Sequence, residues 1–149
     1  PANYSFEYLF ATTMAGQPLA WMEASNLPDE AFKLKKLVEQ YKELQYNFHQ
    51  GIILPIGDEP SGRSWTGFQS ICDQVNKAPS GYLLIYREDN DQDETWIETW
   101  LPEGKEIVCT PIFGSGKAMN SIVGRKGSIK VTLPKKNNFV MYQYQVKEN

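Results

Sequence analysis

The fold is decided by three consecutive segments: YSFEYLFATTMAG (4–16), QPLAWME (17–23) and DEAFKLKKLVEQYKELQYNFHQ (29–50). In the first and third segments, apolar residues recur at the spacing of three and four that is typical of a helix. The second segment is a short apolar run, as expected for a strand that is buried on both faces. We therefore predict a helix, a short strand and a long helix. This pattern is a piece of a parallel α/β layer, and one strand cannot form such a layer alone.

The third segment has the clearest helical pattern in the chain. Ser25 to Asp29 supplies cap residues and a proline for the first turn, and Gly51 follows the last turn. One apolar stripe runs along this helix, and we expect it to be buried against the β region or the neighbouring helix. The stripe consists of Leu34, Leu37, Val38, Tyr41, Leu44 and Phe48.

After Gly51 the sequence changes to short β-like runs separated by turn residues. Runs of this kind bury their faces by packing as two antiparallel sheets, so we predict a mainly β fold with an antiparallel β-sandwich. The segment 52–57 is a short extended segment, and the turn-rich loop 58–64 that follows it is of the kind that joins domains. The β-like runs of the sandwich come after this loop and are Trp65–Cys72, Gly81–Arg87, Thr95–Leu101, Lys105–Phe113, Gly127–Leu133 and Asn138–Val146.

Gly81–Arg87 is apolar on both faces, which predicts a central strand. We expect Thr95–Leu101 to pair with it in a hairpin whose tip is Glu88–Glu94. Five of the seven residues of that tip are acidic, which indicates a solvated loop. The alternate aspartates resemble a calcium loop, but the loop lacks its glycine and its distal glutamate, so a solvated tip is favoured.

Composition narrows the class of protein. The chain has 149 residues, 41% hydrophobic, and a formal net charge of −3, which is typical of a globular domain and argues against a nucleic-acid partner. Six cations without an acid between Lys117 and Lys136 are interpreted as solvated surface. No apolar run approaches the ~20 residues of a membrane span. The sequence begins at Pro1 without methionine, so we expect a C-terminal portion of a longer protein, and its localisation is unknown.

The sequence contains no recognisable catalytic, cofactor-binding or metal-binding motif. Cys72 and Cys109 lie in strand-like runs and are favoured as buried free thiols, with a disulfide as the alternative. His49 is the only histidine, which argues against a zinc site. A nucleophile pair of Cys72 or Cys109 with His49 is disfavoured, because His49 lies at the polar end of the predicted helix.

Trp96, Glu98 and Trp100 alternate along one predicted strand and therefore share one of its faces. Two indoles that flank an acid can stack on a sugar ring and bind its hydroxyls, which makes these residues a possible carbohydrate site. The alternative is that the indoles cover the core, because large apolar side chains are usually buried. We favour this alternative and predict that at least one of the two indoles is mostly buried.

A resemblance adds to these observations. The segments Tyr8–Glu23, Leu37–Leu44 and His49–Ile56 together resemble the end of the catalytic barrel in α-galactosidases, above all glycoside hydrolase family 36 and its relatives. In that family a helix and the eighth barrel strand lead into a final helix with a Tyr-Lys and a His-x-Gly motif, and a β-sandwich follows. Tyr41, Lys42, His49 and Gly51 match these motifs, whereas Gln45 stands where the family often has arginine.

The resemblance implies that residues 1–57 are the terminal helix-strand-helix of a (β/α)8 barrel and that residues 58–149 are a C-terminal β-sandwich. It implies a retaining glycosidase whose two catalytic carboxylates lie on earlier barrel strands, upstream of Pro1. The expected function is a structural accessory domain that is not catalytic by itself, with the upstream barrel of the same polypeptide as its partner. The alternative is a carbohydrate-binding module with an oligosaccharide as its partner.

Overall fold

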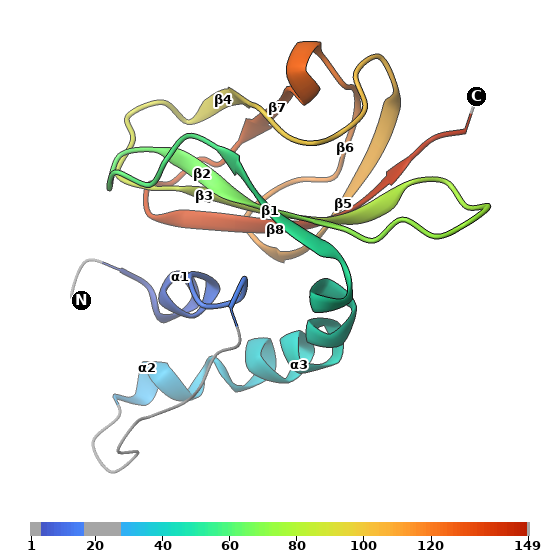
Figure 1. Cartoon of the computed structure of the whole chain (residues 1–149). Helices are drawn as coiled ribbons and strands as arrows, with labels where there is room; N and C mark the ends of the chain where they lie inside the picture. The colour runs from blue at the N-terminus through green and yellow to red at the C-terminus, as the bar shows by residue number, and fades with distance from the viewer. Residues whose placement is uncertain (1–3, 17–27, 149) are drawn as a thin grey trace.

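The computed structural model describes residues 4–16 and 28–148 of the chain. It is mainly β, with a six-stranded antiparallel sheet in the order β1-β2-β3-β8-β5-β6 and a two-stranded sheet of β4 and β7 (Figure 1). The elements are α1 (Phe6–Ala11), α2 (Asp29–Phe32), α3 (Lys35–Gln50), β1 (Ile52–Gly57), β2 (Trp65–Ile71), β3 (Ser80–Arg87), β4 (Glu94–Ile97), β5 (Glu106–Gly114), β6 (Met119–Ile122), the 3-10 helix η2 (Arg125–Gly127), β7 (Ile129–Thr132) and β8 (Asn138–Val146).

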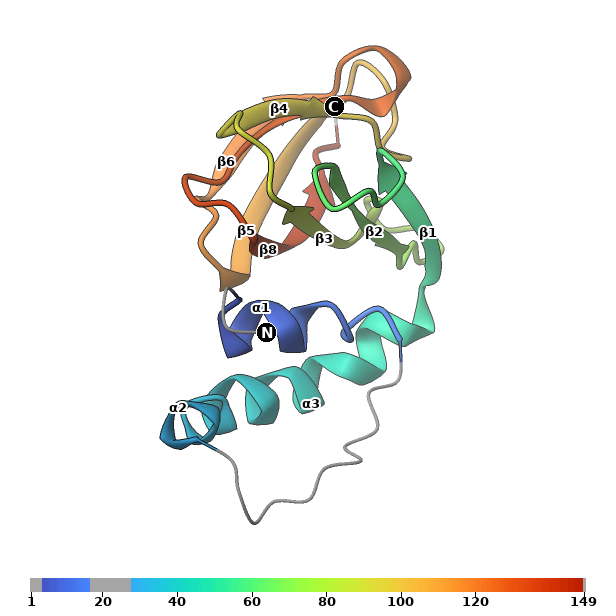
Figure 2. The ribbon, with the colours of Figure 1, turned by 90° about the vertical axis from the view of Figure 1, so that its left-hand side faces the viewer.

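The large sheet lies between the helices and the small sheet. Figure 2 shows α1 next to one face of the large sheet, with α3 beyond α1, and β4 on the opposite side of the molecule. The C-terminal end of α3 approaches the sheet where the chain enters β1 (Figure 1). Both faces of the large sheet are therefore covered, one by helices and the other by strands.

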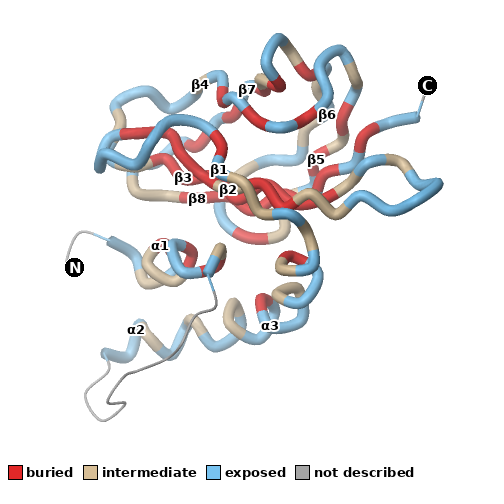
Figure 3. Tube along the Cα trace, in the orientation of Figure 1, coloured by how far each residue is buried: buried red, intermediate tan, exposed pale blue. Residues whose placement is uncertain are grey.

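Strand β3 shows how the two faces divide the core. All its residues from Gly81 to Arg87 are buried, as Figure 3 shows for the centre of the sheet. Leu83 and Ile85 belong to the cluster that includes the strands of the small sheet, whereas Leu84 belongs to the cluster that includes the helices. The prediction of a central strand with two apolar faces is confirmed.

Tyrosine hydroxyls join α1 to the sheet and to α3. The Tyr86 hydroxyl donates to the Ala11 carbonyl oxygen over 2.6 Å, and the Tyr41 hydroxyl donates to the Met14 carbonyl oxygen. These carbonyls lie at and beyond the C-terminal end of α1, where helix carbonyls lack partners within the helix. The ring of Tyr41 also contacts Phe10 edge-on, at 5.7 Å between centroids.

The first two helices are shorter than predicted. Ser5 caps α1 by accepting from the Tyr8 amide, but α1 ends at Ala11, where the hydroxyls of Thr12 and Thr13 bond back to carbonyls of the helix. The predicted helix 29–50 is interrupted between α2 and α3, where amides bond three residues back, as in a 3-10 turn. The predicted strand 17–23 lies outside the described residues.

Two residues of the stripe on α3, Tyr41 and Phe48, are fully buried, and Leu37 and Leu44 pack against the same cluster while half-buried. Leu34 and Val38 are half-buried and lie outside that cluster, so the prediction of a buried stripe is confirmed for Tyr41 and Phe48 and only in part for the other four residues.

The predicted hairpin between Gly81–Arg87 and Thr95–Leu101 is wrong. Strand β3 pairs with β2 and β8, while β4 pairs with β7, so the acidic segment crosses from one sheet to the other. The buried side chain of Arg87 fixes this crossing, because its guanidinium donates to the carbonyl oxygens of Asn90 and Leu133. Strand β1 pairs with β2, across the predicted boundary at residue 57. The division into two domains and the sandwich remain predictions.

The buried position of Phe48 gives a stability prediction. Phe48→Ala should lower the free energy of unfolding by about 3–5 kcal/mol, because it removes a large side chain from the layer between the helices and the sheet. Urea denaturation measures the effect. Tyr46→Ala is the matched control on the same helix, since Tyr46 is 69% exposed, and should change the value by less than about 0.5 kcal/mol. Equal effects of the two variants would contradict this packing.

The buried tyrosines give a prediction for alkaline pH. Burial raises the pKa of Tyr41 from 10.0 to about 12, and it is the main cause of a similar rise for Tyr142 and Tyr144. The unfolded chain releases these protons at lower pH than the native chain, so the contribution of these tyrosines to native stability is fully present below pH 10 and should be lost as the pH rises from 10 to 12. Urea denaturation at a series of pH values measures this. A flat stability across that window would show that these hydroxyls are accessible to solvent.

Candidate functional site

The predicted carbohydrate residues Trp96, Glu98 and Trp100 are all exposed, although the predicted strand Thr95–Leu101 is shorter in the structure, where β4 ends at Ile97. From Trp96 to Leu101 burial alternates, with Ile97, Thr99 and Leu101 buried and the residues between them exposed. Trp96 is 61% exposed and Trp100 is 59% exposed, so the prediction that at least one indole is mostly buried is wrong. The buried residues of the alternation already fill the core on this side, which leaves the indoles facing solvent. We call the surface formed by Trp96, Glu98, Trp100, Lys126 and Lys130 the tryptophan face.

Trp100 is held in a single orientation although its ring is exposed. Its indole Nε1 donates to the Pro55 carbonyl oxygen over 2.9 Å, and its backbone amide donates to Gln69 Oε1 over 2.8 Å. Gln69 is buried, and its Nε2 donates to the Tyr144 hydroxyl over 3.1 Å. The bond to Pro55 orients the indole, and the buried network of Gln69 and Tyr144 holds the backbone at Trp100. Gln69 could not be identified from the sequence, because a glutamine in a strand is usually solvated.

A hollow of about 410 Å³ lies beside Trp96. Its other lining residues are polar: Gln92, Asp93, Glu94, Thr95 and Lys130. Lys130 and Glu94 are joined by an ion pair of 2.7 Å, and Lys126 approaches Glu98 to 3.3 Å. The tryptophan face therefore alternates aromatic rings with paired charges.

Acidic residues of the segment 89–98 form ion pairs with lysines of the segment 126–136. Lys126 and Lys130 bind glutamates of the 94–98 region, and Lys136 approaches Asp89 to 3.0 Å and Asp91 to 2.5 Å. The hydrogen bond from Lys136 lowers the pKa of the Asp91 carboxyl, because it stabilises the charged carboxylate. These exposed pairs support the interpretation of the cations as a solvated surface. Among the described residues, no group of three or more histidine, cysteine, aspartate or glutamate side chains is placed to hold a metal ion.

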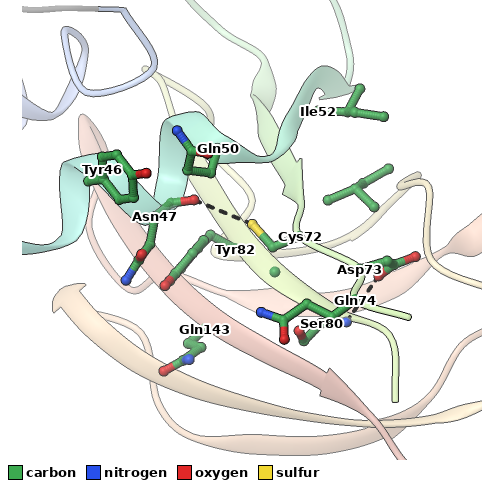
Figure 4. Close-up of a pocket in the computed structure, with 12 residues that line it drawn as sticks. Tyr46, Asn47, Gln50, Ile52, Cys72, Asp73, Gln74, Ser80, Tyr82 and Gln143 are labelled. Atoms are coloured by element: carbon green, nitrogen blue, oxygen red, sulfur yellow. Dashed lines mark hydrogen bonds between the residues drawn. The ribbon is translucent and has the colours of Figure 1, made fainter. Parts of the chain in front are cut away.

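A larger pocket, of about 740 Å³, lies where the C-terminal end of α3 meets the ends of β2 and β3 (Figure 4). We call it the amide pocket, because Asn47, Gln50, Gln74 and Gln143 contribute to its lining. Tyr46, Cys72, Asp73, Ser80 and Tyr82 are among its other lining residues. Asp73 is engaged within the chain, since its Oδ1 accepts from the Ser80 amide over 3.1 Å.

Cys72 is the nucleophilic group of the amide pocket, and its hydrogen-bond partners are neutral oxygen atoms. Its Sγ donates to the Asn47 carbonyl oxygen at 3.5 Å (Figure 4). It also lies 3.3 Å from Ser70 Oγ. His49, the candidate base, instead places its Nε2 3.4 Å from the Tyr41 hydroxyl. This arrangement does not activate a thiol.

Both cysteines are free, and the large sheet separates them. Cys109 belongs to the core on the side of the small sheet, whereas Cys72 packs against the core on the side of the helices. The favoured prediction of free thiols is confirmed. Cys109 is fully buried as predicted, but Cys72 is only half-buried.

Comparison of the chain with protein-family models, with curated proteins and with solved structures finds no match. In the part of the chain that the structure describes, no helix is long and apolar enough to cross a membrane.

The two thiols should differ in reactivity. Burial raises the pKa of Cys109 to about 12, so only a very small fraction of its thiol groups is ionised near neutral pH, and the sulfur is also inaccessible to a reagent. An aromatic disulfide reagent should therefore modify Cys72 alone in the native protein and both thiols in denaturant, as measured by released thiolate. Cys72→Ser should abolish the native reaction and Cys109→Ser should leave it unchanged. Fast native modification of Cys109 would contradict the assigned core.

Proposed function

We propose that the chain is the C-terminal accessory domain of a multidomain, retaining, α-galactosidase-like glycoside hydrolase, and that it is not catalytic by itself. In this proposal the N-terminal helices, with segment 17–23, are the end of a (β/α)8 barrel, and residues 58–149 are the antiparallel β-sandwich that follows it. The upstream barrel of the same polypeptide is the partner.

One observation carries the proposal: α3 leads through Gly51 directly into β1, the edge strand of the large sheet. This is the order of elements that the resemblance requires. The residues that carry the resemblance are also those that build the junction. Tyr41 is buried and bonded to the Met14 carbonyl, and the His49 ring nitrogen lies beside the Tyr41 hydroxyl.

Gly51 has a steric reason to be glycine at this junction. A Cβ atom at this position would lie 2.2 Å from Ser70 Oγ and 2.8 Å from the Ile71 carbonyl oxygen. Ser70 Oγ in turn donates to the Phe48 carbonyl oxygen over 2.5 Å, close to the C-terminal end of α3. The glycine of the His-x-Gly motif therefore permits the close approach of α3 to β2.

The physical role of the domain follows from this packing. The β region covers the apolar stripe of α3, which would otherwise be exposed to water at the end of the barrel. Retaining glycosidases need two carboxyl groups about 5–5.5 Å apart, one of them with a raised pKa. The resemblance implies that this pair lies on the upstream barrel strands, so the accessory domain stabilises the catalytic part and performs no chemistry.

A paired assay tests the proposed function. This chain alone should not hydrolyse aryl α-galactoside or aryl α-glucoside, whereas the polypeptide extended by the coding sequence upstream of Pro1 should hydrolyse one of them. Release of the aryl alcohol measures both. Turnover by this chain that is lost when one of its own acids is changed would overturn the proposal, as would an extended polypeptide without glycosidase activity.

A further inference from the structure

We propose that the tryptophan face binds a neutral oligosaccharide, which stacks on the exposed indoles of Trp96 and Trp100. This assigns a ligand to a surface that has no part in the accessory role. The inference does not depend on the proposed function, because every contact that carries it lies within this chain.

The first support is the exposure of two large indoles that are pre-oriented. Exposed tryptophans are uncommon because burying their apolar area is favourable, so two on one face indicate a binding surface. The bond from the Trp100 indole to Pro55 restrains its ring, and the bond from its backbone amide to Gln69 holds the chain there, which reduces the conformational entropy that a ligand must remove on binding. The flat, apolar face of a sugar ring is complementary to such an indole.

The second support is the set of polar groups around the rings. The hollow beside Trp96 offers the amide of Gln92, the hydroxyl of Thr95 and the Glu94–Lys130 pair, which are the donors and acceptors that sugar hydroxyls require. A second ion pair joins Lys126 to Glu98, the exposed residue midway between Trp96 and Trp100 in the sequence. Trp96 and Trp100 are four residues apart, which separates their Cα atoms by at most about 14 Å, so an oligosaccharide of a few units is long enough to reach from one to the other.

The same polar groups favour a sugar over a protein partner. The centre of a protein–protein interface is depleted of charged residues, whereas here the Glu94–Lys130 pair lines the hollow beside Trp96 and a second pair joins Glu98 to Lys126. Burying these pairs under an apolar surface would cost solvation energy. A sugar replaces the lost water contacts with hydroxyl groups, so the charged pairs remain hydrogen-bonded.

The position of the face keeps it accessible. Trp96 is on β4, which lies on the opposite side of the large sheet from α1 and α3 (Figure 2). A barrel that adjoins the helices would therefore leave Trp96 uncovered. Ile97, on the other face of β4, points into the core, so a ligand on Trp96 would leave the core packing unchanged.

Titration of this chain with stachyose, maltotetraose, cellotetraose and mannotetraose tests the proposal. Calorimetry should show binding of at least one of these probes at millimolar or tighter affinity. The NMR signals of the Trp96 and Trp100 indole N–H groups should shift, while that of the buried Trp65 should not. Each of Trp96→Ala and Trp100→Ala should weaken binding by about tenfold, the upper value for one aromatic contact. The double variant should not bind.

Tyr46→Ala is the matched control, because it removes an equally exposed aromatic side chain from α3. It should leave the affinity unchanged. Trp100→Phe keeps a ring without the indole N–H and should retain part of the affinity, which separates loss of stacking from loss of folding. Absence of binding to all four probes would overturn the proposal, as would binding that survives in the double variant. Self-association that both tryptophan substitutions abolish, without sugar binding, would reassign the face as an interface between copies of the chain.

Discussion

Burial of the six-stranded sheet on both faces is the constraint on which the rest of the structure depends. Leu83 and Ile85 need apolar partners on one side, while Tyr82, Leu84 and Tyr86 need them on the other. A sheet of this kind is stable only when separate elements cover each face. The small sheet covers the first face and the helices cover the second. The hydroxyl of Tyr86 adds a directional contact on the second face, because it donates to the Ala11 carbonyl oxygen at the end of α1. Tyr41 of α3 donates to the Met14 carbonyl oxygen and so joins the two helices of that layer.

The strands could be predicted from the sequence because their signal is local. The continuous apolar run within Gly81–Arg87 makes both faces of the strand apolar, and this identifies a buried central strand without knowledge of its neighbours. The pairing of that strand could not be predicted in the same way. The seven-residue acidic segment suggests a hairpin with the next strand, but β3 pairs with β8, which begins more than fifty residues later in the chain. What redirects the chain after β3 is Arg87, whose buried guanidinium binds two backbone carbonyls. This role cannot be predicted from the sequence, because an arginine at the end of a strand is usually exposed to solvent.

The candidate site shows a similar division. Alternation placed Trp96, Glu98 and Trp100 on one face, and it left open which face is buried. Size alone favoured burial of the indoles, yet Ile97 and Leu101 provide the apolar contacts on the inner side. The residue that orients Trp100 is Gln69, thirty-one positions earlier and on another strand. Only the folded chain brings the two together, so neither the exposure nor the orientation of the indole could be derived from the local pattern.

The two faces of the large sheet also separate two kinds of constraint on the sequence. On the helix side, Gly51, Ser70 and Phe48 contact one another closely, so a change at one of them disturbs the junction between helix and strand. On the outer side of β4, a change at Trp96 alters the surface and leaves the inward contacts of Ile97 in place. Surface substitutions of this kind usually cost less than about 0.5 kcal/mol. Stability therefore constrains the residues that attach the helices, whereas ligand recognition can constrain the tryptophan face without affecting the fold.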